Sequence, residues 1–158
     1  RLLLMDEPFS GMDAMVRDEL VDGLLATAAE HGCTVVISSH DLAELETLAD
    51  WVGFLDGGRL RLSAPAEELR TRYRRIEIVA AAGGAAVPEL PGRVLSSGQA
   101  GQRTSLLLET EAGVPVEELR RRLGGGDRVE IRPATLREIF IGLGRASEST
   151  GARREVAA

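Results

Sequence analysis

Two adjacent carboxylates and a histidine stand where apolar segments of the chain end. Asp6 and Glu7 follow the apolar residues 2–5, and His40 follows a second apolar segment at residues 34–38. One carboxylate in such a place can hold Mg²⁺, and a second beside it can polarise an attacking water. Taken alone, Asp-Glu after an apolar run is more typical of an acidic turn, so the interpretation depends on the surrounding elements.

Those elements predict an α/β unit. After Arg1, residues 2–5 form a continuously apolar segment, which is typical of a strand buried in a parallel sheet, and residues 34–38 are rich in β-branched residues. Between them, Asp13 suits a helix N-cap, Gly32 suits the residue that stops the helix, and apolar residues recur at four-residue spacing. The order is strand, helix, strand, and then a second helix after Asp41.

This order predicts where the chemical groups meet. Parallel strands joined by a helix point the same way, so His40 should emerge at the same sheet edge as Asp6 and Glu7. That carboxyl edge is where open α/β sheets bind their ligands. We therefore expect two carboxylates and an imidazole to converge on one site.

The rest of the chain changes character. Asp56-Gly57-Gly58 predicts a hairpin turn, and Pro65 suits the first turn of a helix that runs to about Tyr73. The chain is expected to divide into an α/β lobe at 1–62, a linker helix at 63–75, an accessory α+β domain at 76–144 and a disordered tail at 145–158. Within the accessory domain, strands are expected at 75–81, 93–97, 104–110 and 128–132, and helices at 116–123 and 135–143.

Composition excludes several classes of protein. The net charge of −6 argues against a nucleic-acid partner, which requires a basic face. The longest apolar stretch, Ile78 to Val87, is short and contains two glycines, whereas a membrane span needs about 20 residues. The single cysteine, Cys33, has no internal partner for a disulfide, which favours a cytosolic protein.

The residues that follow the first strand carry a family resemblance. Leu2-Leu3-Leu4-Met5-Asp6-Glu7-Pro8, then Ser10-Gly11-Met12-Asp13, then Ser39-His40-Asp41 resemble the Walker B strand, D-loop and H-loop of ATP-binding-cassette (ABC) ATPases. Leu48-Ala49-Asp50 and Phe54 to Leu60 are similar to the usual continuation. The resemblance covers residues 1 to about 62 and implies a partial parallel-sheet P-loop NTPase lobe.

The resemblance also implies roles for individual residues. Asp6 would help to hold Mg²⁺ through water, Glu7 would be the general base, and His40 would contact the γ-phosphate of ATP. ATP and Mg²⁺ are the implied cofactors. The loop that crosses to a second ATP-binding subunit in a head-to-tail dimer would contain Ser10, Gly11 and Asp13.

Two segments of a complete ABC ATPase are missing. All 19 basic residues are arginines, so a phosphate-binding Gly-x-x-x-x-Gly-Lys-Ser/Thr loop is absent. The family's Leu-Ser-Gly-Gly-Gln segment is also absent before the Walker B strand, and Ser97-Gly98-Gln99 is instead expected to connect a hairpin. We expect the chain to be a C-terminal fragment whose missing N-terminal half carries the nucleotide clamp.

Ala134 to Phe140 resembles, more loosely, the C-terminal extension of ABC-2 exporter subunits, although a final amphipathic helix closing a small core fits equally well. The implied protein hydrolyses ATP, drives a transmembrane permease subunit and lies on the inner face of the cell membrane. One alternative is an inert truncated product, or an interaction module that docks through residues 75–143. The other is a non-transport ABC ATPase, although the heptad repeats of its coiled coils are not seen.

Overall fold

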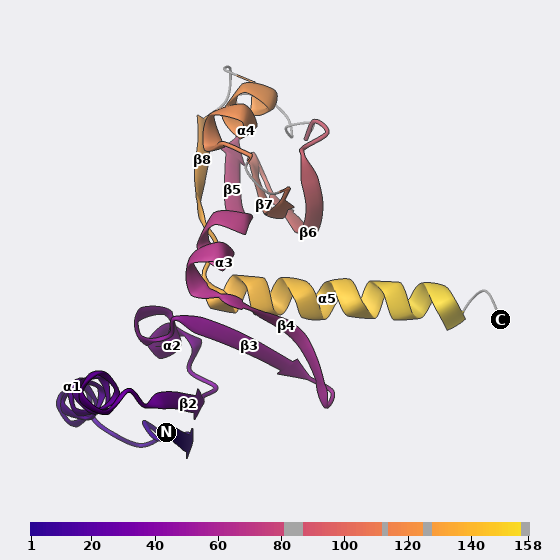
Figure 1. Cartoon of the computed structure of the whole chain (residues 1–158). Coiled ribbons are helices and arrows are strands. Elements are labelled where there is room, and N and C mark those ends of the chain that lie inside the picture. The colour runs from indigo at the N-terminus through magenta and orange to yellow at the C-terminus, as the bar shows by residue number, and fades with distance from the viewer. Residues whose placement is uncertain (81–86, 112–113, 125–127, 156–158) are drawn as a thin grey trace. The chain divides into compact units, whose positions relative to one another are not determined.

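A computed structural model describes residues 1–80, 87–111, 114–124 and 128–155 (Figure 1). The chain forms two compact units, Arg1–Leu48 and Ala49–Ala158. The described residues form a mixed α/β protein in which β1 and β2 pair in parallel and the other strand pairs are antiparallel.

The first unit has the predicted strand-helix-strand-helix order. The side chain of Asp13 accepts hydrogen bonds from the amides of Met15 and Val16, and Gly32 ends the long helix with a left-handed φ of 55°. The strands are parallel and in register from Leu2 opposite Thr34 to Asp6 opposite Ser38. Its elements are β1 (Leu2–Asp6), α1 (Ala14–His31), β2 (Thr34–Ser38) and α2 (Leu42–Leu48).

The prediction that these strands are buried is wrong for this unit. Leu2 is 62% exposed, Leu4 68% and Val36 49%, and α1 contains no buried residue. The described residues pair β1 with β2 alone, and a parallel sheet of two strands leaves much of its apolar surface uncovered. The apolar pattern therefore gives the strands correctly but not their burial.

The second unit contains a hairpin and a four-stranded antiparallel sheet in the order β6-β7-β5-β8. The hairpin turns at Gly57 and Gly58, both with positive φ, as the Asp-Gly-Gly pattern predicts. The elements are β3 (Trp51–Asp56), β4 (Arg59–Pro65), α3 (Ala66–Arg72), β5 (Tyr73–Val79), β6 (Gly92–Ala100), β7 (Arg103–Thr110), α4 (Val116–Leu123), β8 (Arg128–Pro133) and α5 (Leu136–Glu155).

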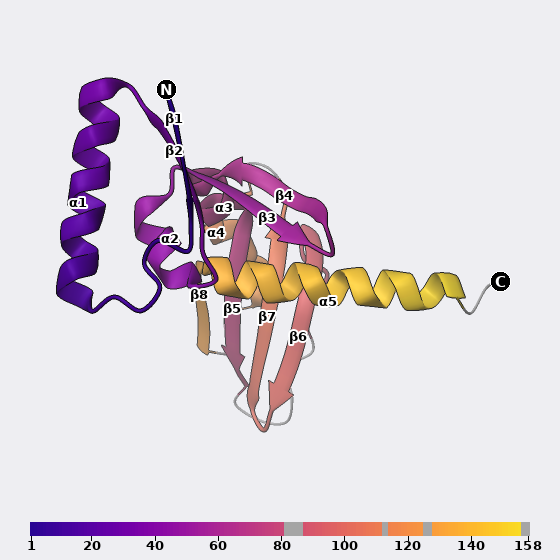
Figure 2. The ribbon, with the colours of Figure 1, turned by 90° about the horizontal axis from the view of Figure 1, so that it is seen from below.

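Two apolar cores cover the two faces of this sheet. Ile76 and Leu108 pack on one face with Leu119 of α4. Leu107 points to the other face and packs there with Ile139 of α5, because successive side chains of a strand alternate. Figure 2 shows α5 crossing the strands on that side. This unit thus has the core that the first unit lacks.

One feature of the second unit differs from the sequence predictions. Ser97-Gly98-Gln99 lies inside β6 rather than in a turn, because the turn is made further on by Gly101 with a φ of 59°. The hairpin packs Ala64 into the core beside Tyr73, and the compact unit that contains it begins at Ala49.

Candidate functional site

The carboxyl edge of the β1–β2 pair brings together the residues singled out in the sequence. Glu7 follows β1 and His40 follows β2, and the two strands end side by side with Asp6 opposite Ser38. The Nδ1 atom of His40 lies 2.7 Å from Oε2 of Glu7, within hydrogen-bonding distance. As expected from parallel strands, the imidazole and the second carboxylate meet at one edge.

Glu7 has an unusual backbone. Its φ is 46°, and it is the one non-glycine residue with positive φ among the described residues. The left-handed region costs an L-residue about 1–2 kcal/mol, so neighbouring contacts must hold it there. The amide of Glu7 donates to the backbone oxygen of Ser38 at 3.0 Å and to the Ser38 hydroxyl at 3.2 Å. These bonds to β2 fix the turn that aims the Glu7 side chain.

Ser38 is a member of this cluster that sequence reasoning missed. Its hydroxyl donates to Oδ1 of Asp6 as well as accepting from the Glu7 amide. The available signal was its position: in a parallel pair of equal length, the last residue of β2 stands opposite the last residue of β1. A polar side chain there lies within reach of Asp6.

The electrostatics of the edge favour a charged histidine. The pKa of His40 is raised above its ordinary value, mainly by the hydrogen bond with the Glu7 carboxylate and then by the negative charge of Glu7 itself. Asp41 and Glu44 act in the same direction, and the small desolvation of this exposed ring opposes them. The edge therefore presents a carboxylate paired with an imidazole that holds its proton more tightly than a free histidine.

The loop after Glu7 is short and hydrogen-bonded. The Ser10 amide donates to the Glu7 carbonyl at 3.1 Å, and the φ of Gly11 is 75°. Phe9 is buried, whereas Ser10 and Gly11 are exposed. The Asp13 carboxylate caps α1 rather than facing Asp6 or Glu7. The loop thus exposes Ser10 and Gly11 beside the edge while Asp13 fixes the start of the helix.

Arg17 connects this loop with the segment after His40. Its guanidinium donates to the Met12 carbonyl at 3.4 Å and forms an ion pair of 2.8 Å with Glu44 of α2. The Glu44 side chain is 12% exposed, so this pair is better shielded than an ordinary surface ion pair. The loops that carry Glu7 and His40 are therefore held together by contacts on both sides.

The donors at the edge are compatible with Mg²⁺ but not with a site made of protein ligands alone. Among the described residues, no group of three or more histidine, cysteine, aspartate or glutamate side chains is placed to hold a metal. Mg²⁺ commonly keeps several waters and binds through one or two carboxylates together with substrate phosphates. The exposed carboxylate of Asp6, held by Ser38, fits that mode of binding.

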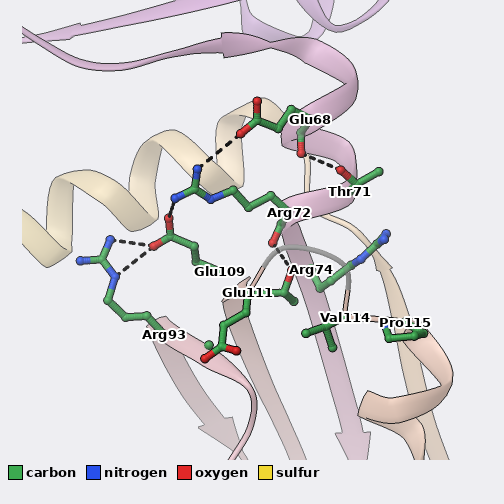
Figure 3. A pocket seen from close by; sticks show the side chains of 11 residues that line it. Glu68, Thr71, Arg72, Arg74, Arg93, Glu109, Glu111, Val114 and Pro115 are labelled. Atoms are coloured by element: carbon green, nitrogen blue, oxygen red, sulfur yellow. Dashed lines mark hydrogen bonds and ion pairs between the residues drawn. The ribbon is translucent and has the colours of Figure 1, made fainter.

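A separate cavity of about 970 Å³ lies in the second unit (Figure 3). Two of its three arginines are paired within the protein, because Glu109 lies 2.6 Å from Arg72 and 2.8 Å from Arg93. Burial and the charge of Glu109 raise the pKa of the adjacent Tyr73 to about 12, so this phenol stays neutral. The cavity has none of the strand-end carboxylates or histidines of the first unit.

None of the described helices has the length and apolar character of a membrane span.

Known proteins similar to this chain share one description. No protein-family model matches it. It is 39% identical over 74 residues to an aliphatic sulfonates import ATP-binding protein of Pseudomonas aeruginosa, which is 47% of this chain and 27% of that protein. It is 44% identical over 64 residues to a molybdenum import ATP-binding protein of Rhodobacter capsulatus, which is 40% of this chain and 18% of that protein.

A third relative is a bacitracin transport ATP-binding protein of Bacillus licheniformis, 38% identical over 74 residues, which is 47% of this chain and 24% of that protein. The chain spans between about a fifth and a third of the length of these and the neighbouring relatives. Over about half of its own length, then, the chain is similar to ATP-binding subunits of ABC transporters.

Proposed function

We propose that this chain, similar over half its length to ABC transporter ATP-binding subunits, provides the hydrolytic edge of such a subunit. The observation that carries the proposal is the 2.7 Å contact between His40 and Glu7 at the carboxyl end of two parallel strands. The reaction is hydrolysis of ATP, coupled to transport through a membrane permease. Residues 1–62 are then part of a P-loop NTPase lobe, and 76–144 an accessory domain joined to it by the linker helix 63–75.

Glu7 is the general base in this proposal. Its carboxylate takes a proton from the attacking water, and the hydrogen bond from His40 limits the directions in which that carboxylate can turn. The left-handed backbone and the two bonds from its amide to Ser38 place the side chain at the strand end. A base already held in one orientation has less conformational entropy to lose when the transition state forms, which lowers the barrier.

His40 has a complementary role. Nδ1 faces the Glu7 carboxylate, so the other ring nitrogen can donate a hydrogen bond to the γ-phosphate only when the imidazole is protonated. The negative charges around the ring favour its protonated form, which strengthens a bond to an anion. Asp6 would hold Mg²⁺ through water, and the metal, when bound, neutralises charge on the phosphate oxygens.

The exposed loop beside the edge is proposed to reach the second subunit. Ser10 and Gly11 are exposed, and Asp13 caps the first turn of α1 and so fixes the end of the loop. In the proposed head-to-tail dimer, this loop contacts the partner ATP-binding subunit beside its nucleotide. A cytoplasmic position on the inner face of the cell membrane and an exporter role complete the proposal, the latter resting on residues 134–140. The net charge of −6 argues against a nucleic-acid partner.

A graft tests the proposal. Residues 1–62 replace the corresponding segment of the Pseudomonas aeruginosa relative, and ATP hydrolysis is measured. We expect hydrolysis that falls at least about tenfold in the His40→Ala graft, with ATP binding kept, since a contact to the γ-phosphate acts in turnover. His31→Ala is the matched control, because His31 lies at the end of α1. An inactive wild-type graft that still folds, or equal rates in the two histidine variants, would contradict the proposal.

A further inference from the structure

One hydroxyl group touches both carboxylate residues of the edge. The Ser38 Oγ atom donates to the Asp6 side chain and accepts from the Glu7 amide at 3.2 Å, which uses its single proton and one lone pair in opposite directions. The Ser38 carbonyl accepts from the same amide at 3.0 Å. No other described side chain is bonded to both Asp6 and Glu7.

We propose that the Ser38 hydroxyl is a positioning group for this site, orienting the Asp6 carboxylate by donation and holding the strained Glu7 backbone by acceptance. Its importance for catalysis rests on the proposed function, whereas its hold on the backbone does not. Ser38 is not itself a catalytic residue, because it acts on the two carboxylate residues rather than on ATP or water.

The geometry explains why one hydroxyl matters here. A residue at a φ of 46° returns readily to the ordinary region unless its amide is fixed, and the Glu7 amide is fixed only through Ser38. If that backbone relaxes, the Glu7 carboxylate swings away from His40. Asp6, released from the same hydroxyl, then loses its fixed orientation as well. Loss of one oxygen atom therefore loosens both carboxylates together.

The test uses the full chain and amide hydrogen exchange followed by NMR. In Ser38→Ala the Glu7 amide keeps one of its two acceptors, and we expect its exchange to accelerate about fivefold, as for the loss of one ordinary hydrogen bond. Ser38→Thr keeps the hydroxyl and should return exchange to the wild-type rate. Thr34→Ala removes a hydroxyl from the other end of β2 and controls for a general loosening of the strand.

Unchanged exchange in Ser38→Ala, or an equal acceleration in Thr34→Ala, would overturn the inference. The graft into the relative separates it from the proposed function. There, Ser38→Ala should lower kcat about tenfold with little change in KM, because positioning acts in the transition state. A graft that hydrolyses ATP at the same rate with and without the hydroxyl would overturn the catalytic part. A wild-type graft without activity would contradict the proposed function and leave the exchange result standing.

Discussion

The backbone of Glu7 gives a prediction whose sign is informative. At an ordinary exposed position, a protein with glycine is usually less stable than the same protein with alanine, by about 0.5–1 kcal/mol. The reason is that glycine gives the unfolded chain more conformational freedom. At a φ of 46° the order should reverse. We therefore compare Glu7→Gly with Glu7→Ala, two variants that lose the same carboxylate and the same contact with His40.

The magnitude follows from two opposing terms. The left-handed conformation costs alanine about 1–2 kcal/mol and costs glycine almost nothing. Subtracting the entropic disadvantage of glycine leaves Glu7→Gly more stable than Glu7→Ala by about 0.5–1 kcal/mol. Because the contact with His40 is lost in both variants, it cancels from the comparison.

Urea denaturation followed by the NMR signals of α1 measures this difference. Trp51 and Tyr73 lie in the second unit, so fluorescence would report on the wrong part of the chain. For a unit of this size, the midpoint of Glu7→Gly should be about 0.5 M or more above that of Glu7→Ala. The same pair of substitutions at the exposed helix residue Glu30 is the control and should show the ordinary order. If glycine were the less stable residue at position 7 as well, the claim of a strained backbone would be refuted.

Three further predictions concern single contacts. Glu7→Gln should lower the pKa of His40 toward 6.5 in an NMR titration, and an unmoved pKa would contradict the pairing. In the wild type, the pairing stabilises the fold fully below pH 6.5, and this stabilisation is lost as the pH rises through the raised pKa of His40. Glu138→Gln should cost the second unit about 1 kcal/mol near neutral pH, because it weakens the two hydrogen bonds from Arg132. Desolvation raises the pKa of Glu138, but these bonds, the Thr135 amide and the nearby arginine charges lower it on balance. That contribution is present above the ordinary glutamate pKa and is lost as pH falls through the lowered value, so equal acid sensitivity of variant and wild type would refute it. Gly92→Ala should cost about 3 kcal/mol in thermal or urea unfolding, because its Cβ would lie 2.1 Å from a backbone oxygen, whereas Gly98→Ala should change little.

Local patterns predicted the elements of the first unit well. The two ends of α1 were predicted from its capping residues, and Asp13 and Gly32 cap the helix as expected. The parallel arrangement of the two strands then placed His40 beside Glu7 without further information. These features follow from short-range chemistry and from one topological rule, so the sequence contains enough to derive them.

Other features depend on three-dimensional contacts that no local pattern expresses. The left-handed backbone of Glu7 and the double role of Ser38 appear only when β1 and β2 are in register. The exposure of Leu4 depends on how many strands flank β1, and the local sequence around Leu4 does not determine that number. In the second unit, the turn fell at Gly101 because pairing between β6 and β7 extends past the glycine at position 98.

The central claim is that Glu7 acts as the base in ATP hydrolysis. The most direct test is Glu7→Gln in the graft that carries residues 1–62, with ATP binding and single-turnover hydrolysis measured on the same preparation. We predict unchanged binding and a rate lower by about 10²- to 10⁴-fold, while Glu30→Gln on α1 leaves both unchanged. Hydrolysis at the wild-type rate in Glu7→Gln would show that Glu7 is not the base.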